Sequence, residues 1–389
     1  MIPLRYNVRS LAVRKATTAA TALGIGLVVF VLSTSQMLAD GIQHTLGSAG
    51  DPGRAIVLRK GADNELVSTI DAKLVNVIMA ASGVRRDQRG PRGVAELLTI
   101  IALPRANSAT ALSNVAVRGI SDRALDFHSD AKLIAGRAPR IGADEAMIGR
   151  RLRGQYRGLS LGQSFVLKKN LSVRVVGVFD AGGSVHESEI WCDAQLVQSA
   201  FGREGLLSSV TVELQTPSAF AGFRSTIERE RSYGLSVERE STYYEKQSEG
   251  TATLVRFLGG AVVLFFSIGA SIGATITMYA AVAQRRREVG TLRALGFSRT
   301  AILSSFLIES LLLALIGGSV GAACSLAMGQ LELTMVNFST LSEMTFAFHA
   351  SASMLGLALA VGILMGLAGG LLPAVRAARL SPIEAMREA

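Results

Sequence analysis

Four long segments without charged side chains constrain this chain more than any other feature of its sequence. They are residues 16–39, 257–283, 300–331, in which Glu309 is the one exception, and 350–375. A helix rises about 1.5 Å per residue, so roughly 20 such residues cross the hydrocarbon core of a bilayer. The first segment, with 24 uncharged residues, exceeds the ~7–15 apolar residues of a signal peptide and is predicted to remain as an anchor. The sequence therefore predicts four membrane-spanning helices with both chain ends on one side.

The distribution of charge predicts which side that is. Residues 1–15, 284–299 and 376–389 together hold twelve basic and three acidic residues, whereas residues 40–250 hold 27 basic and 24 acidic ones. Lys and Arg accumulate in the short cytoplasmic loops of membrane proteins. The first three segments are therefore expected in the cytoplasm and residues 40–250 outside it. This bias accounts for most of the net charge of +10 without nucleic acid, for which the sequence offers no recognised binding module.

Residues 40–250 are predicted to fold as a large α+β domain. A charged fraction of 18% is too high for a chain made only of spans. Strands are predicted at 54–59, 94–103, 114–120, 173–179 and 210–214, and helices over 65–80 and 218–232. The basic residues at 150–153, with Arg157, are expected on a solvated helix face. Cys192 and Cys324 are predicted not to pair, because one lies in this domain and the other in a span.

No catalytic or metal-binding motif stands out. The run His186-Glu187-Ser188-Glu189 has groups that can bind zinc, but an HExxH site needs a second histidine where Ile190 stands. The nearness of Ser184 to His186 in sequence is no evidence for the geometry of a catalytic triad. The chain also lacks the G-x-x-x-x-G-K-(S/T) phosphate loop. We therefore expect a non-catalytic chain that binds no metal or cofactor of its own.

The segment between the second and third spans combines arginines with a short helical pattern. Val289, Leu292 and Leu295 recur near helical spacing, and Gly296 is the predicted stop of that helix. A cytosolic partner could bind such a helix. The alternative is a plain loop whose arginines only lie at lipid headgroups.

The residues of this segment resemble those of a known family. Arg287-Glu288-Val289-Gly290-Thr291-Leu292-Arg293-Ala294-Leu295-Gly296 resembles the cytoplasmic coupling segment of the FtsX-like permeases, the group that includes MacB and LolC/LolE proteins. Its usual form there is RE-(I/V)-G-(I/T)-x-(R/K)-A-(L/I)-G. The end of the chain, LPAVRAARLSPIEAMR at 372–387, is similar to family tails that read P-A-x-x-A-(A/S)-x-(L/I)-x-P-(I/V)-x-A-L-R. The four-span layout with a large domain between the first two spans is also typical of the family.

The resemblance implies the permease subunit of an ABC complex in the bacterial inner membrane, one that transmits ATP-driven movement to a two-lobed periplasmic domain. Because this chain begins at the membrane, unlike a MacB-like chain with its ATPase at the amino end, ATP and Mg are expected in a separate cytosolic ABC ATPase, in two copies. Further implied partners are a second permease copy or paralogue, a periplasmic adaptor or membrane fusion protein, and membrane lipid. The implied cargo for export or extraction is a lipid, lipoprotein or other hydrophobic molecule.

Two other functions stay open. One is an FtsX-type transmembrane regulator of cell-wall hydrolases, which keeps the scaffold without transport. The other is a passive membrane-anchored receptor or scaffold without an ATPase.

The expected parts of the chain follow from these patterns. They are a cytoplasmic amphipathic leader (1–15), spans at 16–39, 251–283, 300–328 and 350–375, a periplasmic α+β domain (40–250) with a β-rich insert at about 114–205, a cytoplasmic coupling segment (284–299), a short periplasmic loop (329–349) and a cytoplasmic tail (376–389).

The residues expected to carry function form three groups. By resemblance, ATPase coupling falls to Arg287, Glu288, Val289, Gly290, Leu292, Arg293, Ala294, Leu295 and Gly296. Small residues let membrane helices approach closely, so helix packing and a dimer are assigned to Gly269, Gly273, Gly317, Gly321, Gly362, Gly366 and Gly370. Glu309 is the intramembrane polar residue. Helix capping, a bond to polar backbone, contact with Arg256 and proton coupling all remain open for it.

Overall fold

The computed structural model describes residues 9, 11, 13–108, 111–337 and 340–381. Most of the predicted leader and the last part of the predicted tail lie outside these residues. The chain divides into two compact units. We call Met1–Asp40, Thr253–Leu331 and Phe348–Ala389 the helical unit, and Gly41–Ala252 with Glu332–Ala347 the α+β unit. The chain therefore passes between the two units at four points.

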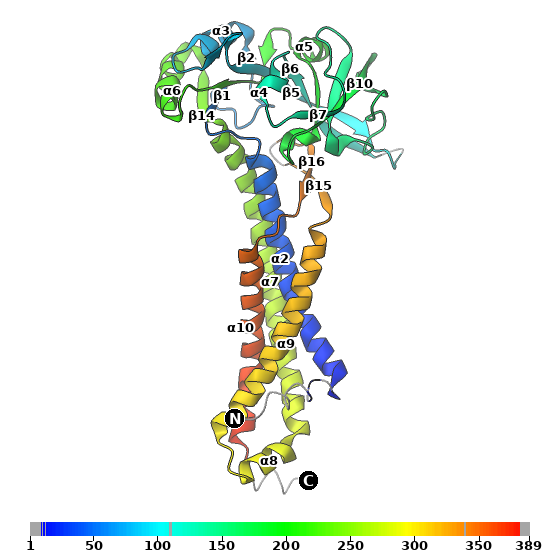
Figure 1. Cartoon of the computed structure of the whole chain (residues 1–389), viewed down its shortest axis with the longest axis vertical. Helices are drawn as coiled ribbons and strands as arrows, with labels where there is room; N and C mark the ends of the chain where they lie inside the picture. Colours follow the sequence, from blue (N-terminus) through cyan, green and yellow to red (C-terminus); the bar gives the residue numbers. More distant parts are fainter. Residues whose placement is uncertain (1–8, 10, 12, 109–110, 338–339, 382–389) are drawn as a thin grey trace. The chain divides into compact units, whose positions relative to one another are not determined.

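The helical unit is built from helices long enough to span a membrane. Four such helices are found among the described residues: α2 (Lys15–Gly47), α7 (Glu240–Gln284), α9 (Arg299–Met328) and α10 (Ala352–Arg379) (Figure 1). The prediction of four apolar helices is confirmed. Serine side chains set the starts of two of them, because Ser298 accepts a hydrogen bond from the Ala301 amide and Ser351 from the Met354 amide.

The second long helix extends well beyond the length that a membrane needs. Helix α7 has 45 residues, and its first residues belong to the α+β unit while the rest belong to the helical unit. The segment contains no proline, so its ladder of backbone hydrogen bonds can continue. One continuous helix therefore contains the whole second span.

The α+β unit is organised around one large mixed sheet. Its strand order is β14-β1-β13-β5-β6-β11-β8-β10-β7, with β9 paired to β10 (Figure 1). Neighbours pair antiparallel except β6 with β11 and β8 with β10, which pair parallel. The strands of this sheet are β1 (Arg54–Arg59), β5 (Gly93–Pro104), β6 (Leu112–Ile120), β7 (Lys132–Gly136), β8 (Glu145–Gly149), β9 (Ser164–Lys168), β10 (Leu171–Asp180), β11 (Glu189–Asp193), β13 (Ser209–Glu213) and β14 (Leu235–Arg239).

Shorter elements complete this unit. The helices are α3 (Ala72–Ala80), α4 (Ala124–Phe127), α5 (Ala194–Phe201) and α6 (Phe220–Arg229), with the 3-10 turns η1 (Arg150–Leu152), η2 (Val185–Ser188), η3 (Pro217–Ala219) and η4 (Arg231–Tyr233). Three two-stranded pairs join β2 (Ile70–Asp71) to β12 (Leu206–Leu207), β3 (Arg86–Asp87) to β4 (Gly90–Pro91), and β15 (Glu332–Val336) to β16 (Glu343–Ala347). The predicted α+β architecture is confirmed.

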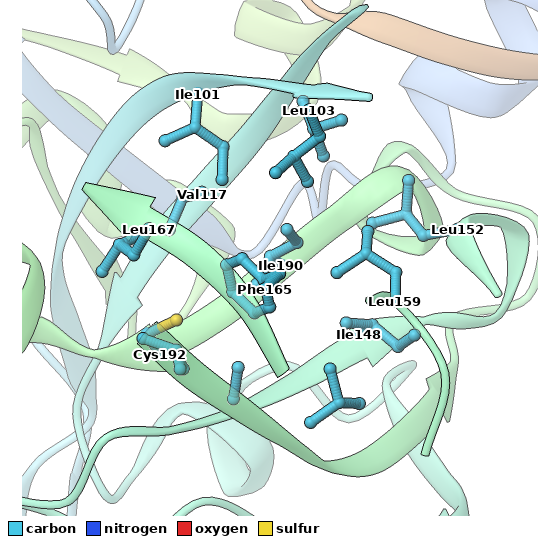
Figure 2. Packing of buried hydrophobic residues seen from close by; sticks show 14 of the residues in the cluster. Ile101, Leu103, Val117, Ile148, Leu152, Leu159, Phe165, Leu167, Ile190 and Cys192 are labelled. Carbon is cyan, nitrogen blue, oxygen red and sulfur yellow. The ribbon is translucent and has the colours of Figure 1, made fainter. Parts of the chain in front are cut away.

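Each lobe of the sheet carries a hydrophobic core. In the first, Phe165, Ile148, Ile190 and Cys192 pack together between strands β6, β8, β9, β10 and β11 (Figure 2). In the second, residues of β1, β13 and β14 pack against α3 and α6. Cys192 is buried and Cys324 is exposed, and both are free thiols, as predicted.

Strand β5 belongs to both lobes. Its residues 93–96 pair with β13, and its residues 97–104 pair with β6. The two cores are therefore joined by one uninterrupted stretch of backbone rather than by a linker.

Four local predictions differ from the structure. The helix predicted over 65–80 is only α3, because Asp71 caps it and accepts a hydrogen bond from the Lys73 amide. The helix predicted over 218–232 is limited to α6. The basic run at 150–153 is not a solvated helix face, since Arg151 lies buried against Glu187. The loop expected at 329–349 contains the β15–β16 hairpin, which belongs to the α+β unit.

Candidate functional site

Helix α8 (Arg286–Ala294) holds the residues predicted to couple to an ATPase. One of its faces is buried within the helical unit. Val289 is 3% exposed and packs in a cluster with Met278 of α7, Ile302 and Phe306 of α9, and residues of α10. Leu292 packs against the same cluster, and Gly290 is buried. A change in the position of α8 therefore bears directly on three long helices.

The other face of α8 is exposed. It carries Arg287, Glu288, Thr291, Ala294 and Leu295. Leu295 is 72% exposed, so it does not lie with Val289 and Leu292 on one apolar stripe as the spacing predicted. These exposed side chains are the part of α8 that a partner could reach.

Gly296 ends this helix as the sequence predicted. Its φ angle is +92°, a left-handed conformation that glycine adopts without steric cost. The Gly296 amide donates to the Arg293 carbonyl and the Phe297 amide to the Leu292 carbonyl, which is the pair of bonds in a Schellman ending. Arg293 also donates to the Phe297 carbonyl at 2.9 Å. This ending fixes Leu295 at the tip of the helix.

Glu309 lies beside the start of α8 and is paired with arginines. Its side chain is 1% exposed. One oxygen bonds Arg14, at the start of α2, and the other bonds Arg285, at the start of α8, at 3.0 Å. Arg256 instead pairs with Asp40 at 3.1 Å, so the contact between Glu309 and Arg256 considered from the sequence is wrong. The pairing of Glu309 joins α2, α8 and α9 through one carboxylate.

The predicted packing glycines divide into two sets. At five of them an added methyl group would clash within the helical unit: Gly317 on the Ala22 carbonyl, Gly321 on the Gly26 carbonyl, Gly362 on Val29, Gly366 on Ala314 and Gly370 on Ser310. Gly269 and Gly273 of α7 have no atom of the described residues within 4 Å of such a methyl group. The first set lies at close contacts within the chain, whereas the second faces away from it.

The β15–β16 hairpin is bonded to the rest of the α+β unit by several side chains. Glu343 accepts from the Tyr156 hydroxyl at 2.9 Å and pairs with Arg105. Arg151 donates to the Thr345 carbonyl at 2.6 Å, and Ser188 accepts from the Thr345 amide. The sequence analysis missed this hairpin, although the alternation in Glu343-Met344-Thr345-Phe346-Ala347 is a strand signal.

A buried ionic cluster was also missed. Arg118 of β6 bonds Glu65, Glu96 and Glu189 at 2.8 to 3.1 Å, and all four side chains are at most 4% exposed. Burial disfavours the charge on Arg118, but Glu189, Glu65 and Glu96 raise the pKa of its guanidinium well above the usual value. Burial likewise opposes ionisation of Glu96, yet His128 and Arg118 lower its pKa to about 2. These groups are therefore charged at neutral pH.

Comparison with known families agrees with this architecture. Four spans with a large α+β domain between the first two define a permease-type membrane protein. The sequence profile of the MacB-like periplasmic core domain matches residues 16–230, more than half of the chain, and that of the FtsX-like permease C-terminal region matches residues 260–382. The chain therefore belongs to the FtsX-like permease family of MacB type.

The chain is also similar to individual proteins, and it covers a different share of each of them. The uncharacterized ABC transporter permease YknZ of Bacillus subtilis is 25% identical over 99% of this chain and 96% of its own length. The macrolide export ATP-binding/permease protein MacB of Pectobacterium atrosepticum is 30% identical over 57% of this chain and 34% of its own. MacB 2 of Aeromonas hydrophila is 28% identical with similar coverage. The chain spans about a third of the length of these two MacB proteins.

Solved structures of extramembrane domains are also similar. The extracellular domain of YknZ from Gram-positive bacteria covers 48% of this chain with 15% identity and a TM-score of 0.37, and the chain covers 99% of it. The periplasmic region of MacB from Actinobacillus actinomycetemcomitans covers 53% of this chain with 13% identity and a TM-score of 0.38, and the chain covers 96% of it.

Proposed function

We propose that the chain is the membrane subunit of an ABC transporter in the bacterial inner membrane, and that it transmits the movement of a cytosolic ABC ATPase to a periplasmic α+β domain. ATP and Mg bind in that partner, which is present in two copies. The chain contributes binding surfaces and a mechanical connection rather than a catalytic step. The observation that carries the proposal is the two-faced helix α8, whose exposed face is available to a partner while its buried face contacts three spans.

The route from α8 to the α+β unit supports transmission. Helix α7 is one helix with residues in both units, so a push at its α8 end acts along its axis. Helices α9 and α10 reach the α+β unit through the hairpin, which Arg105, Tyr156, Arg151 and Ser188 bond in place. All four long helices thus have a covalent path into the α+β unit.

The surroundings of the spans support a hydrophobic cargo. The charge bias places both termini and α8 in the cytoplasm and the α+β unit in the periplasm. A groove of about 390 Å³ between α2 and α9 is lined by apolar side chains, among them Leu23, Leu27, Phe30 and Val320. Such a groove suits an acyl chain, and two relatives are named for macrolide export. We infer export or extraction of a lipid, lipoprotein or other hydrophobic molecule, with a periplasmic adaptor as an additional partner.

A second copy of the chain, or a paralogue, fits the open face of α7. Phe265, Gly269, Ile272, Gly273 and Ile276 lie on one face of this helix by their spacing. Phe265 is 73% exposed and Ile276 is 63% exposed. Two glycines between large apolar residues let a neighbouring helix approach closely. The dimer is therefore assigned to this face.

Co-purification in mild detergent tests the ATPase assignment. We expect a stoichiometric ABC ATPase to remain bound to the native chain, and Leu295→Asp to remove it without lowering the amount of folded permease. Leu112→Asp is the matched control, because Leu112 is 66% exposed on the α+β unit and lies far from α8 in sequence.

Two outcomes would contradict the proposal. If an ATPase stays bound to Leu295→Asp as well as to the native chain, α8 is not the coupling surface. If no ATPase but a soluble envelope protein is recovered, the chain is a passive receptor instead.

A further inference from the structure

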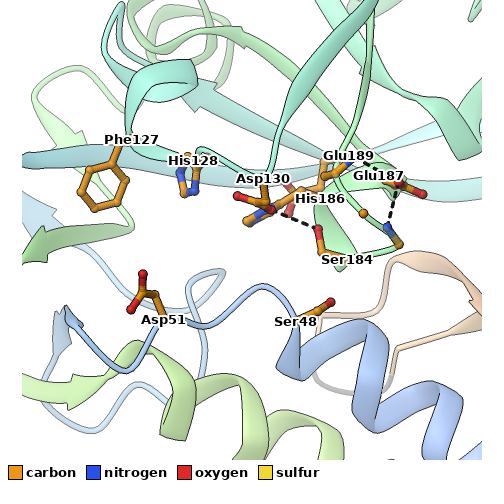
Figure 3. A network of polar contacts seen from close by, with 12 residues as sticks. Ser48, Asp51, Phe127, His128, Asp130, Ser184, His186, Glu187 and Glu189 are labelled. Atoms are coloured by element: carbon orange, nitrogen blue, oxygen red, sulfur yellow. Dashed lines mark hydrogen bonds and ion pairs between the residues drawn. The ribbon is translucent and has the colours of Figure 1, made fainter.

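Three metal-binding side chains converge inside the α+β unit, outside the surfaces used above. They are His128, which follows α4, Asp130 two residues later, and His186 in η2 (Figure 3). One ligand atom from each lies within 4.8 Å of the others, and His186 Nδ1 is 3.7 Å from Asp130 Oδ2. An HExxH motif would need a second histidine four residues after His186. The fold instead places His128, 58 positions earlier in the sequence, beside His186.

Each histidine has a ring nitrogen that makes no hydrogen bond within the described residues, and that of His186 faces the Asp130 carboxylate at 3.7 Å. The Nδ1 atoms of His128 and His186 are buried and make no hydrogen bond within the described part of the chain. On the other side of each ring, His128 Nε2 lies 3.0 Å from Glu96, and His186 Nε2 lies 3.5 Å from the Tyr244 hydroxyl. A histidine held from behind by a carboxylate or hydroxyl, with its other nitrogen open, is the usual arrangement of a metal ligand.

The rings are also fixed by packing. His128 and His186 are 3% and 0% exposed, and their centroids are 5.0 Å apart. Trp191 packs against both of them, at 5.4 and 5.6 Å. An imidazole held in this way loses little freedom when it binds an ion.

The charge balance around the histidines favours a cation. Glu65, Glu96 and Glu189 share the single positive charge of Arg118, so this buried group carries an excess of negative charge. The carboxylate of Asp130, 3.7 Å from His186 Nδ1, adds a further negative charge. Excess buried charge is costly unless it is paired or bound to a metal.

We propose that His128, Asp130 and His186 bind a divalent transition-metal ion, best matched by Zn²⁺. Two imidazoles and one carboxylate are a common zinc ligand set, with a fourth position open to water. Zinc ligand bonds of about 2.0–2.2 Å place ligand atoms roughly 3.3 Å apart in a tetrahedron. Metal binding would therefore draw the three ligand atoms closer together than the 4.8 Å within which they lie.

The ion would act on the hairpin through η2. This turn holds His186 in the cluster, while its Ser188 bonds Thr345 and its Glu187 pairs with Arg151, the residue that donates to the Thr345 carbonyl. Metal binding would therefore stabilise the connection between α9, α10 and the α+β unit. This inference is independent of the ATPase partner.

Titration of the full-length chain tests the site. The protein is purified in detergent with a tag that contains no histidine, stripped with a chelator, and titrated with Co²⁺ and then Zn²⁺. We expect one Co²⁺ per chain, with visible absorption bands of a four-coordinate site that Zn²⁺ abolishes. Asp130→Asn and His186→Gln should each weaken binding at least ~10–100-fold, the loss typical even for supporting residues of a metal site.

The chain offers its own controls, since it has only four histidines. His44→Gln and His349→Gln change the two exposed ones and should leave the titration as it is. If His186→Gln fails to fold, Asp130→Asn decides alone, because this side chain is 33% exposed and tolerates an isosteric change. Absence of stoichiometric Co²⁺ binding, or equal binding by Asp130→Asn, overturns the proposal.

Discussion

The two units bury their charges in opposite ways. In the helical unit one carboxylate, Glu309, lies between two guanidinium groups, those of Arg14 and Arg285. In the α+β unit one guanidinium group, that of Arg118, lies among three carboxylates. The surplus positive charge of the first cluster rests on arginines that are 18% and 11% exposed, whereas the surplus negative charge of the second is fully buried. The two clusters therefore differ both in the sign of their surplus charge and in their exposure.

The largest effect is expected from removing the centre of the second cluster. Arg118→Met would remove the guanidinium group that Glu65, Glu96 and Glu189 share. Breaking a buried ion pair typically costs about 3–5 kcal/mol, and we expect at least this loss in the free energy of unfolding, measured by denaturant titration of the full chain. Arg89→Met is the control, because the pair of Arg89 with Asp126 is 69% and 65% exposed and should contribute about 0–1 kcal/mol. Equal effects of the two changes would contradict the comparison.

A smaller loss is expected in the helical unit. Glu309→Ala removes the shared partner of Arg14 and Arg285, but both arginines keep some access to solvent. We expect a cost of about 3 kcal/mol, near the lower end for a broken buried pair, in the same unfolding measurement. Asp40→Ala, which breaks the more exposed pair with Arg256, should cost less. If Glu309→Ala unfolds like the native chain, Glu309 does not join the three helices.

Two glycine positions compare a close helix contact with an open position within the helical unit. An added methyl group at Gly317 would lie 2.2 Å from the Ala22 carbonyl oxygen, a backbone atom that cannot rotate away. Gly317→Ala should therefore push α2 and α9 apart and destabilise the chain by about 1–3 kcal/mol. Gly356→Ala on α10 meets no described atom within 4 Å and should be neutral or slightly stabilising, since alanine favours helix. Thermal unfolding of both variants provides the measurement, and similar shifts would refute the packing assignment.

The smallest expected effect is the pH dependence of the stability of the β15–β16 hairpin. Burial opposes ionisation of Glu343, but hydrogen bonds from Arg105 and Tyr156 lower its pKa below the usual value. A carboxyl group with a lowered pKa stabilises the folded state above its unfolded pKa of about 4.3, and this contribution is lost as pH falls through the folded pKa. Because Arg105 is 37% exposed, we expect no more than about 1 kcal/mol.

Hydrogen exchange of the β15 and β16 amides, corrected for intrinsic rates, measures that contribution. Protection should stay constant from pH 7 to about pH 5 and fall as the pH is lowered further through the folded pKa of Glu343. Glu343→Gln should show the lower protection already at pH 7. Protection that depends neither on pH nor on this substitution would show that the Glu343 carboxylate does not stabilise the hairpin.

Much of the helical unit could be predicted from the sequence because its signals are local. Uncharged runs predict the spans, and the step from an apolar pattern to Gly296 predicts the end of α8. The position of Leu295 could not be predicted in this way. Its exposure depends on which face of α8 the three spans cover, and that is set by packing rather than by spacing along the chain.

The polar clusters of the α+β unit were missed for a related reason. Glu65, Glu96, Arg118 and Glu189 are far apart in sequence, and each alone resembles a surface charge in a strand or loop. The pairing of β6 with β5 and β11 brings Glu96, Arg118 and Glu189 together. The same pairing brings His128 close to His186, so a search for neighbouring histidines along the chain could not find that site.

The two lobes of the α+β unit are connected in series along strand β5. A displacement that enters one lobe crosses to the other through peptide bonds and sheet hydrogen bonds, without first having to close a gap between side chains. A change in the angle between the lobes would bend or twist this strand near Glu96 and Leu97, where its pairing partner changes from β13 to β6. Glu96 is also bonded to Arg118 and His128, so the stiffness of that bend depends on the buried charges beside it.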